Sequence, residues 1–360
     1  RVLFRSEEEK MLKEIERIDM SHMEKNIKER FKRLFIKYGT VFSTGPGDVG
    51  ECDLVPHRIK LKDPSKVSNI PQYRIPFALH GVVDTFINEL LKSGVIQKTE
   101  SPFNSPMLLV KKPNVEEDAP LEEKYRLVID YRAVNDMCEG LVYPLMNIYE
   151  LIDEVANSKY LSTFDLKNAF FSQVMEKASR PITAFSVNTQ NTKSSFEFTR
   201  TPQGMKNSSA YFQALMNAVL KDCSAKSFLD DAVIFSDSLE DHYAQVEEFL
   251  KRLKQHNLKI SSKKVQLVRG TVRYLGYDIV PGKKISPSDA KIEVIANWKE
   301  PKNVKEVRQF VGLCSFFRRL THNFAEIARP LNELTKKNSR FAGKLPKEAK
   351  DAFYILKKKL

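Results

Sequence analysis

The feature that most constrains the fold is a pair of neighbouring aspartates, Asp230 and Asp231, set between two short apolar runs in the stretch KSFLDDAVIFSD. Like charges this close repel each other, and aspartate is unfavourable inside a strand. Aspartate tolerates tight turns, so the pattern predicts a hairpin whose two-residue Asp-Asp loop joins two apolar strands. Such a hairpin directs both carboxylates to one place. From this stretch alone, a polar turn without chemistry is the commoner interpretation.

A third carboxylate strengthens the functional interpretation. Asp165 follows the apolar run Leu161–Phe164 in YLSTFDLKNAFF, which predicts a second buried strand. If that strand lies beside the hairpin, the three acids converge, and three carboxylates share a site only when cations neutralise them. Magnesium is the hard cation that suits carboxylate and phosphate oxygens.

The chemistry that fits such a site is phosphoryl transfer. Two Mg²⁺ ions, with Mn²⁺ as an alternative, can clamp the attacking and leaving oxygens of an in-line displacement. This reaction depends on positioning and charge neutralisation rather than on a nucleophilic side chain. The chain accordingly contains no GxSxG, GxxxxGK[ST] or HExxH motif.

The charge of the chain is divided unevenly along its length. The net charge is +13, but residues 251–360 hold 27 Lys and Arg against 9 Asp and Glu, a net charge of +18, so residues 1–250 carry −5. A solvated basic surface would explain this, and so would a module that binds a polyanion. The four cysteines are far apart in the chain and form no CxxC pair, which favours reduced intracellular thiols. No apolar run approaches the roughly 20 residues that span a bilayer, so we expect no membrane partner.

Hydrophobic periodicity predicts an α+β protein. Residues 6–38 have the spacing of one amphipathic helix, and short strands then alternate with helices up to about residue 280. From Ser286 the pattern is helical, with helices expected over Asp289–Trp298, Val304–Thr321 and Phe324–Lys336. A mixed domain is therefore expected to precede a basic helical module.

Nine motifs follow one another along the chain: SPFNSPMLLVKK, YRLVIDYRAVN, STFDLKNAFF, RPITAFSV, TPQGMKNSSAYFQALMN, FLDDAVIFS, LKISSKK, RYLGYDIV and VRQFVGLCSFFRRLTHNFAEIARPLNELTKK. In these motifs the chain resembles the reverse transcriptases of gypsy- and Ty3-type long-terminal-repeat retrotransposons, and more distantly the retroviral enzymes, over about residues 55–340. The resemblance implies a right-hand polymerase with fingers, an antiparallel palm sheet and a helical thumb.

The resemblance also implies a division of the chain. Residues 1–55 would be an N-terminal helical extension, 56–280 the fingers and palm, and 281–340 the basic thumb. Residues 341–360 resemble the start of a linker to a ribonuclease H domain whose catalytic acids are not in this sequence, so no ribonuclease H activity is expected of the fragment. The first residue is Arg1, and we expect the chain to be a piece of a longer Pol polyprotein.

The catalytic residues that the resemblance implies are the palm triad Asp165, Asp230 and Asp231. The backbone carbonyl of Leu166 would complete the shell of one metal ion. In LKISSKK, Lys264 matches a lysine proposed to protonate the departing pyrophosphate. Its neighbour Lys263 remains an alternative for that role.

The nucleotide-binding residues are implied in the same way. Lys112 and Arg126 would meet the triphosphate of the incoming nucleotide, a role that suits arginine because it can contact phosphate bidentately. Phe170 would be the gate that excludes a ribose 2′-OH, and Gln203 and Gly204 would belong to a loop that packs against nucleotide and template. Exposed strand ends explain Lys112 and Arg126 equally well, and a core position explains Phe170 and its neighbour Phe171.

The primer and duplex contacts are implied in two places. Tyr274, Leu275 and Gly276 match a hairpin that grips the primer end. Further along, Arg308, Gly312 and Phe316 lie on one face of a predicted helix, at positions that track the minor groove in the retroviral thumb. A glycine inside a helix costs about 1 kcal/mol relative to alanine, so Gly312 implies close approach of either a duplex or another helix.

The resemblance predicts an RNA- and DNA-templated DNA polymerase. Its partners would be an RNA template, a DNA primer or product duplex, an RNA–DNA hybrid and deoxynucleoside triphosphates, and the family also suggests a transfer RNA primer and a homodimer. A retired copy that binds RNA without catalysis is the alternative, against which the intact acids, Gln203 and Lys112 argue. An RNA polymerase of similar palm geometry is a further alternative, and Phe170 argues against it. The expected location is the cytoplasm, inside a virus-like particle, and the nucleus at a later stage.

Overall fold

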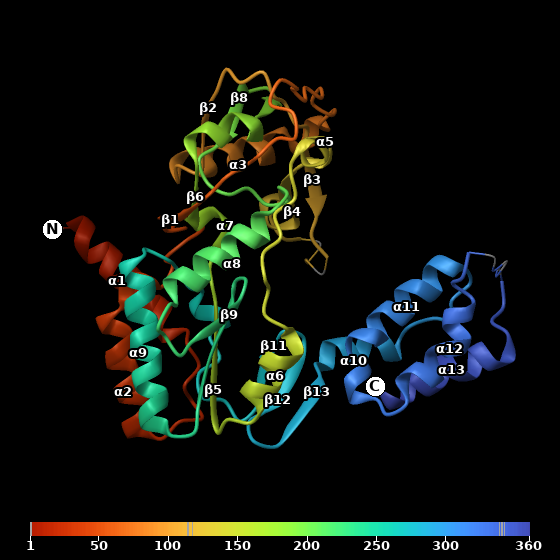
Figure 1. Ribbon diagram of the computed structural model, residues 1–360. Helices are drawn as coiled ribbons and strands as arrows, with labels where there is room; N and C mark the ends of the chain where they lie inside the picture. The colour runs from red at the N-terminus through yellow and green to blue at the C-terminus, as the bar shows by residue number, and fades with distance from the viewer. Residues whose placement is uncertain (1, 114, 117, 338, 340, 342) are drawn as a thin grey trace. The chain divides into compact units, whose positions relative to one another are not determined.

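The computed structural model describes residues 2–113, 115, 116, 118–337, 339, 341 and 343–360 (Figure 1). The chain forms two compact units. The first comprises the residues up to Ile152 together with Ser158–Arg269, and the second comprises Asp153–Asn157 and Gly270–Leu360. The chain thus passes into the second unit at residue 270, eleven residues before residue 281, where the sequence suggested that the thumb begins.

The first unit contains most of the strands. Its helices are α1 (Val2–Glu16), α2 (Lys25–Lys37), α3 (His80–Lys92), α4 (Leu121–Lys124), α5 (Arg132–Met137), α7 (Ala169–Ser172), α8 (Ser208–Val219) and α9 (Leu239–Gln255). Its strands are β1 (Cys52–His57), β2 (Ile96–Lys98), β3 (Met107–Lys111), β4 (Tyr125–Ile129), β5 (Tyr160–Asp165), β6 (Gln173–Met175), β7 (Phe185–Asn188), β8 (Lys193–Phe198), β9 (Lys226–Phe228) and β10 (Asp231–Ser236). Helix α6 (Ile148–Ala156) includes residues of both units.

The second unit is a small sheet followed by helices. Its elements are β11 (Val272–Tyr274), β12 (Tyr277–Val280), β13 (Lys284–Pro287), α10 (Asp289–Ala296), α11 (Val304–Phe316), α12 (Phe324–Glu333) and α13 (Lys347–Lys359). The strand at 284–287 was not predicted, and it pairs with β12 because Ile279 and Ile285 lie opposite each other. This pairing explains why the unit begins before β11 rather than at residue 281.

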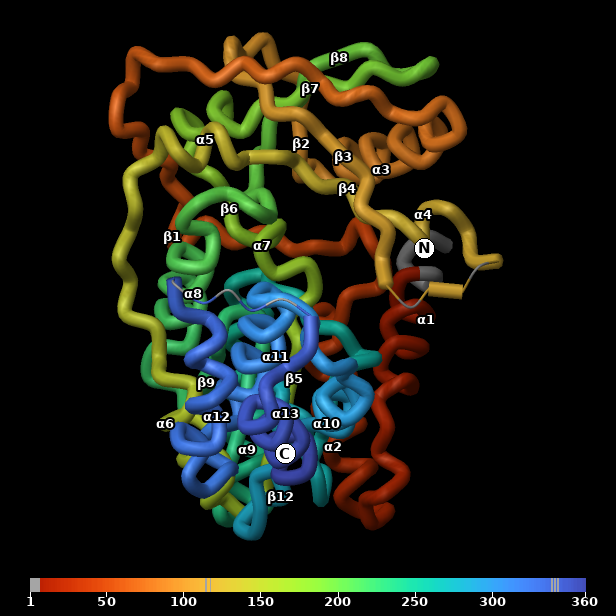
Figure 2. Tube along the Cα trace, turned by 90° about the vertical axis from the view of Figure 1, so that its right-hand side faces the viewer, coloured from red at the N-terminus to blue at the C-terminus, as the bar shows by residue number. Residues whose placement is uncertain are grey.

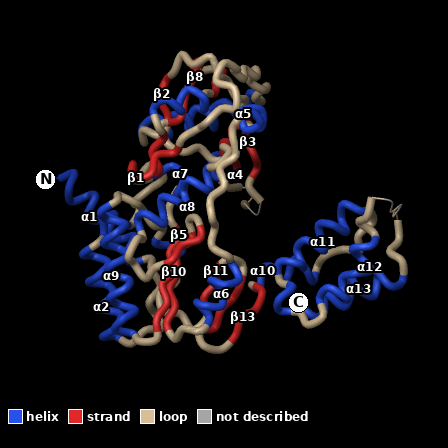
Figure 3. Tube along the Cα trace, in the orientation of Figure 1, coloured by secondary structure: helices blue, strands red, loops and turns tan. Residues whose placement is uncertain are grey.

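The sheets are mostly antiparallel. The sheet β5–β10–β9 runs through the lower half of the first unit (Figure 3), and β2–β8–β7 lies at its other end, where segments distant in sequence come side by side (Figure 2). Strands β3 and β4 form a hairpin, and only β1 and β6 pair in parallel among the described strands. The α+β class predicted from the sequence is confirmed.

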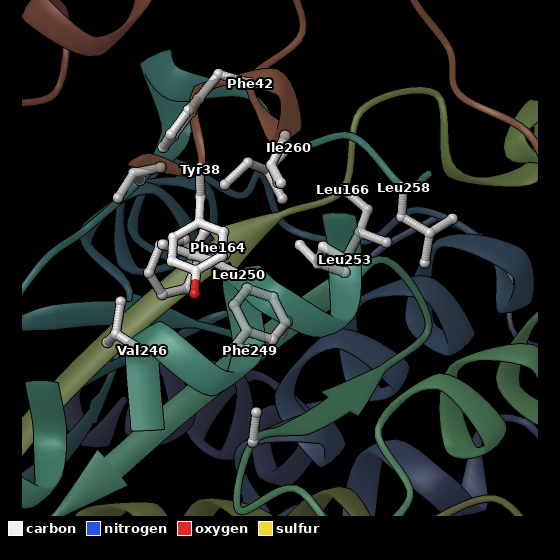
Figure 4. Close-up of a cluster of buried hydrophobic side chains, with 14 of the residues drawn as sticks. Tyr38, Phe42, Phe164, Leu166, Val246, Phe249, Leu250, Leu253, Leu258 and Ile260 are labelled. Atoms are coloured by element: carbon white, nitrogen blue, oxygen red, sulfur yellow. The ribbon is translucent and has the colours of Figure 1, made fainter. Parts of the chain in front are cut away.

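A large hydrophobic core lies against one face of the β5–β10 pair. Phe164 of β5 packs on Phe249 of α9 with 5.1 Å between ring centroids, and both side chains are almost fully buried. Figure 4 shows these rings together with Leu253 and Ile260. At about 25 cal/mol per Å² of apolar surface, each such ring contributes several kcal/mol. The strand that ends in Asp165 is therefore held firmly.

The N-terminal segment belongs to this core. The prediction of one helix over residues 6–38 is wrong, because α1 and α2 are separated by a turn in which the Asp19 carboxylate accepts hydrogen bonds from the Ser21 amide and hydroxyl. Such local bonds compete with helix formation. Phe35 of α2 is fully buried in the core, and Arg30 pairs with Glu240 of α9, beside which α2 lies in Figure 1.

The C-terminal segment is also part of a packed unit. Residues 341–360 were expected to begin a linker, but Lys347–Lys359 form helix α13. Phe353 of α13 is buried, and its ring centroid lies 4.5 Å from that of Phe310 in α11. The ring of Trp298 also contacts Phe310, with 5.9 Å between the ring centroids. None of the helices in the described part of the chain is long and apolar enough to cross a membrane.

Two buried histidines make the first unit sensitive to acid. His57 stacks on Tyr211, and the ring nitrogens of His242 lie 2.7 and 3.1 Å from the hydroxyls of Ser162 and Ser236. Burial lowers the pKa of each imidazole to about 4 from its ordinary 6.5. The unfolded chain therefore binds more protons than the folded one below pH 6.5, and stability must fall as the pH is lowered from about 6.5 to about 4, by about 3 kcal/mol for each histidine.

This expectation is checked by the free energy of unfolding measured between pH 7 and pH 4. The variant His242→Gln removes one of the two groups, so its stability should decline less steeply with acid than that of the wild type. Equal slopes for the two proteins would show that His242 does not contribute.

Candidate active site

The three predicted acids meet at one end of the β5–β10 pair. In the antiparallel register Asp231 lies directly opposite Asp165, and Asp230 precedes Asp231 in the turn. The amide of Leu166 donates a hydrogen bond to the Asp230 carbonyl (2.9 Å), which links the two segments beyond the last strand pair. The convergence that the sequence predicted is therefore present, while the catalytic roles of the acids remain predictions.

The hairpin turn differs from the predicted one. The loop residues are Leu229 and Asp230, because Asp231 already pairs with Phe228 in the strand ladder. Leu229 has a left-handed backbone (φ 54°), which is unusual for a branched apolar residue and costs about 1–2 kcal/mol. Its amide donates to the side-chain oxygen of Gln213 (2.7 Å), which holds the strained turn.

Gln213 is a supporting residue that sequence reasoning missed. It is buried on α8, and its amide nitrogen also donates to the Ser227 carbonyl (3.1 Å) on β9. A glutamine inside the otherwise apolar run FQALM was a signal that could have identified it, because a buried amide must find partners. Gln213 thereby fixes the position of the Asp230 carboxylate through the backbone.

A second segment supports Leu166 from the other side. Ile260 forms bridges with both Leu166 and Phe42, and the Ser261 amide donates to the Asp165 carbonyl (3.0 Å). Ile260 is fully buried, as Figure 4 shows beside Leu166 and Phe42. The N-terminal segment and the LKISSKK motif thus position the backbone on which the acids stand.

The electrostatics of the acids reflect burial and mutual repulsion. Burial, and then the neighbouring Asp230 and Asp165, raise the pKa of Asp231 to about 6. Burial also raises the pKa of Asp230, with Asp165 adding to the effect. Such a cluster is stabilised by positive charge, and one cation is already close, because Lys264 Nζ lies 2.8 Å from Asp165 Oδ2. Lys263 is exposed and makes no ion pair with Asp165 among the interactions of the described residues.

The donor set fits Mg²⁺. Among the described residues, no three His, Cys, Asp or Glu side chains stand close enough to form a metal cage on their own. Mg²⁺ seldom uses such a cage, since one or two carboxylates, water and substrate phosphates usually complete its octahedron. Asp165, Asp230, Asp231 and the Leu166 carbonyl would supply the protein ligands.

A cavity of about 620 Å³ lies in the first unit. Four of the predicted nucleotide-binding residues line it, namely Lys112, Arg126, Gln203 and Gly204. Asn168, three residues after Asp165, also lines the cavity and so connects it to the acids. The volume lies within the range of 300–1,000 Å³ that is typical of small-molecule sites.

Phe170 is placed differently from these four residues. Its ring packs on Phe212 of α8 at 5.3 Å and is partly buried against the core, whereas the next ring, Phe171, lines the cavity and stacks on Phe198. The proposed gate is therefore not on the cavity wall. The role of Phe170 as a sugar gate therefore remains a prediction. Phe171, the neighbouring ring that does line the cavity, is the residue with which it should be compared.

The predicted primer residues lie in the second unit. Leu275 and Gly276 form the two-residue turn between β11 and β12, and both have positive φ (47° and 82°), as a type I′ turn requires. Tyr274 is buried. A Cβ on Gly276 would lie 3.5 Å from the ring of Phe316, so the hairpin packs closely on the end of α11. Phe316 therefore has a structural contact, which the duplex prediction did not include.

The other two predicted duplex residues, Gly312 and Arg308, differ in whether they contact other parts of the chain. Among the described residues, a Cβ on Gly312 would meet nothing within 4 Å, so packing against a described helix does not explain this glycine. The space directly beside Gly312 is open among the described residues, although Phe316 and Arg308 on the same face of α11 contact other parts of the second unit. Arg308 donates to the Thr335 carbonyl (2.7 Å) after the end of α12, a structural contact that the sequence did not predict.

Comparison with known proteins agrees with this geometry. The family profile described as "Reverse transcriptase (RNA-dependent DNA polymerase)" matches residues 110–279. The chain is 32% identical over 283 residues to the retrovirus-related Pol polyprotein from transposon opus of Drosophila melanogaster, covering 78% of the chain and 27% of that protein. It is 33% identical over 319 residues to the polyprotein from transposon gypsy of the same species, covering 86% of the chain and 30% of the relative.

The chain is also 30% identical over 275 residues to the transposon Tf2-3 polyprotein of Schizosaccharomyces pombe, covering 76% of the chain and 20% of the relative. It spans less than a third of the length of these curated relatives.

Solved structures show the same fold. The foamy viral protease-reverse transcriptase in complex with double-stranded DNA is 26% identical with a TM-score of 0.83, covering 97% of this chain and 59% of that one. The foamy viral enzyme in complex with an RNA/DNA hybrid gives a TM-score of 0.81 at 26% identity, covering 97% of this chain and 45% of that one. The right-hand polymerase fold predicted from the motifs is confirmed, and the chain belongs to the reverse transcriptase family of retrotransposon Pol polyproteins.

Proposed function

We propose that this chain extends a primer 3′ end by two-metal phosphoryl transfer, using RNA or DNA as template, within a longer retrotransposon polyprotein. The observation that carries the proposal is the register that sets Asp165 opposite Asp231, with Asp230 in the adjoining turn. Three carboxylates at one strand end need cations, and a cavity lined by Lys112 and Arg126 offers a place for a triphosphate close by.

Each group of site residues would have its own role in this reaction. Lys112 and Arg126 would bind and orient the triphosphate, and Gln203 and Gly204, which line the same cavity, would pack against the nucleotide. Asp165, Asp230 and Asp231 would hold the Mg²⁺ ions, with Mn²⁺ as an alternative. When bound, the ions neutralise charge on the attacking and leaving oxygens. Lys264 would supply a proton to the pyrophosphate, since its ammonium already lies beside Asp165.

The proposed partners are an RNA template, a primer or product duplex, a hybrid and deoxynucleotides, and the proposal extends to a transfer RNA primer and a homodimer. The foamy viral structures support the nucleic acids, because those proteins were solved with double-stranded DNA and with an RNA/DNA hybrid. The net charge of +18 on residues 251–360 supports phosphate contacts that do not depend on sequence. The proposed site of action is the cytoplasm, which the four free thiols favour, with the nucleus at a later stage.

Primer extension tests the proposal. With a labelled DNA primer on an RNA template, the chain should add deoxynucleotides when Mg²⁺ is present and stop when a chelator removes it. A DNA template should support the same reaction. Tight duplex binding without extension under any metal condition would instead indicate a retired copy that only binds nucleic acid.

Replacing Phe170 tests the sugar gate. If its ring excludes the ribose 2′-OH, Phe170→Ala should raise ribonucleotide incorporation relative to deoxynucleotide incorporation by about 10-fold or more, because a steric clash is removed. The matched control is Phe171→Ala, which removes the next ring, the one that lines the cavity. Continued rejection of ribonucleotides by Phe170→Ala, or their acceptance only by Phe171→Ala, would assign the gate elsewhere.

A further inference from the structure

The ion pair between Lys264 and Asp165 occupies an oxygen that the proposed reaction needs. Lys264 Nζ lies 2.8 Å from Asp165 Oδ2, in hydrogen-bonding geometry. The Asp165 side chain is 20% exposed and that of Lys264 is 64% exposed, so the lysine reaches the carboxylate from the solvent side. An ammonium and a divalent cation cannot both occupy that side of one carboxylate oxygen.

Backbone hydrogen bonds hold Lys264 at this position. The lysine ends the short 3₁₀ turn Ser262–Lys264, its amide donates to the Ser261 carbonyl (3.2 Å), and the Ser261 amide donates to the carbonyl of Asp165 itself. Ser262 is buried, and its hydroxyl donates to Glu14 of α1 (2.5 Å). The turn is therefore anchored at both the acid and the N-terminal helix, while the lysine side chain that extends from it is largely exposed to solvent.

The neighbouring lysines show that this arrangement is specific. Lys263 lies on the same turn, is exposed, and lines a separate cavity of about 370 Å³ together with Arg17 and Lys167. Lys259 is tied to the Thr40 carbonyl (2.7 Å) and to Asp48 (3.1 Å). Lys264, unlike these two lysines, forms an ion pair with Asp165.

We propose that Lys264 and a divalent cation exchange on Asp165. The lysine neutralises Asp165 before the metal binds, and metal binding releases the ammonium, which then becomes available to the leaving phosphate. The inference rests on the proposed function and adds to it a coupling between metal occupancy and the position of the proton donor. Exposed ion pairs are weak, and an ion of double charge attracts the carboxylates more strongly than an ammonium does, so the metal wins the exchange.

The test measures Mn²⁺ binding by electron paramagnetic resonance, on the full chain without nucleotide or nucleic acid. If the lysine competes with the metal, Lys264→Met should bind Mn²⁺ about three- to tenfold more tightly than the wild type. Lys263→Met is the matched control, and its affinity should stay within about twofold, because that ammonium does not contact Asp165. Asp165→Asn should lose most of the binding.

A second readout follows the lysine itself. Modification by an amine-reactive reagent at constant pH, quantified by peptide mass spectrometry, should increase several-fold at Lys264 when Mn²⁺ is added and stay constant at Lys263. Lys264→Met replaces an exposed side chain, and its circular dichroism spectrum should match that of the wild type.

Two results would overturn the inference. In the first, the Mn²⁺ affinity of Lys264→Met lies within twofold of that of the wild type, and labelling of Lys264 in the wild type does not change when Mn²⁺ is added. The other is the absence of saturable Mn²⁺ binding in both proteins. The first result together with normal primer extension would leave the proposed function intact and refute the exchange alone, whereas the second together with no extension would refute both.

Discussion

Asp230→Asn abolishes primer extension but leaves duplex binding within about twofold of the wild type: this is the largest effect that we expect. The substitution keeps the size of the side chain and removes a charge that must hold a divalent cation. Losing one preorganised electrostatic contact to a reacting centre reduces turnover by about 10²–10³-fold, and loss of a metal ligand should exceed this. Rates of single-nucleotide addition and filter-binding affinities for a primer–template duplex measure the two quantities separately.

The control for this variant is Asp237→Asn. Asp237 is an exposed residue that directly follows the other end of β10, so its replacement tests the loss of a carboxylate away from the site. It should extend primers at about the rate of the wild type. Parallel losses of binding and extension in Asp230→Asn would indicate that this aspartate supports the fold of the hairpin instead of the chemistry.

The second large effect concerns stability. Phe35→Ala should lower the free energy of unfolding of the first unit by about 3–5 kcal/mol, the range for truncating a buried phenylalanine. Phe35 is fully buried, and its ring meets Phe42 edge-on at 5.4 Å. Phe42 in turn forms a bridge with Ile260, the partner of Leu166. Truncating Phe35 therefore weakens the packing that holds the backbone of the acids in place, although Phe35 itself belongs to a segment without catalytic residues.

The next residue along the helix provides the control. Ile36 is 41% exposed, so Ile36→Ala should change the stability by no more than about 0.5 kcal/mol. Hydrogen exchange of the β5 and β10 amides measures the opening of the first unit alone. Equal effects of Phe35→Ala and Ile36→Ala would show that the N-terminal helices are not an integral part of this core.

The elements around the acids could be predicted from the sequence because their signals are local. Short apolar runs indicated β5 and the β9–β10 hairpin, and the structure has both. The register brings Asp165 opposite Asp231 because β5 ends at Asp165 and its antiparallel partner β10 begins at Asp231. Family motifs then supplied what periodicity cannot, namely which cavity residues belong to the same site.

The errors arose where tertiary contacts override local preference. The turn was assigned to Asp230 and Asp231 because aspartate favours turns, whereas the structure places Leu229 in the left-handed conformation and satisfies its amide with Gln213. Helical spacing continues through residues 17–24, but the Asp19–Ser21 turn interrupts the helix there.

The carboxyl-terminal part shows the same limit. Helix α13 was not expected because residues 341–360 resemble a linker, yet its Phe353 completes the core around Phe310. Arg308 was predicted to face a duplex, and only the structure reveals its hydrogen bond to Thr335. Contacts between segments far apart in the chain leave no periodic trace in either segment.

A crystal structure of the chain with a primer–template duplex, an incoming nonhydrolysable deoxynucleotide and Mg²⁺ tests the central claim most directly. The account predicts metal density between the triphosphate and Asp165, Asp230 and Asp231, with the phosphates against Lys112 and Arg126 in the 620 Å³ cavity. A nucleotide bound elsewhere, or metal ions that do not contact these three acids, would contradict it.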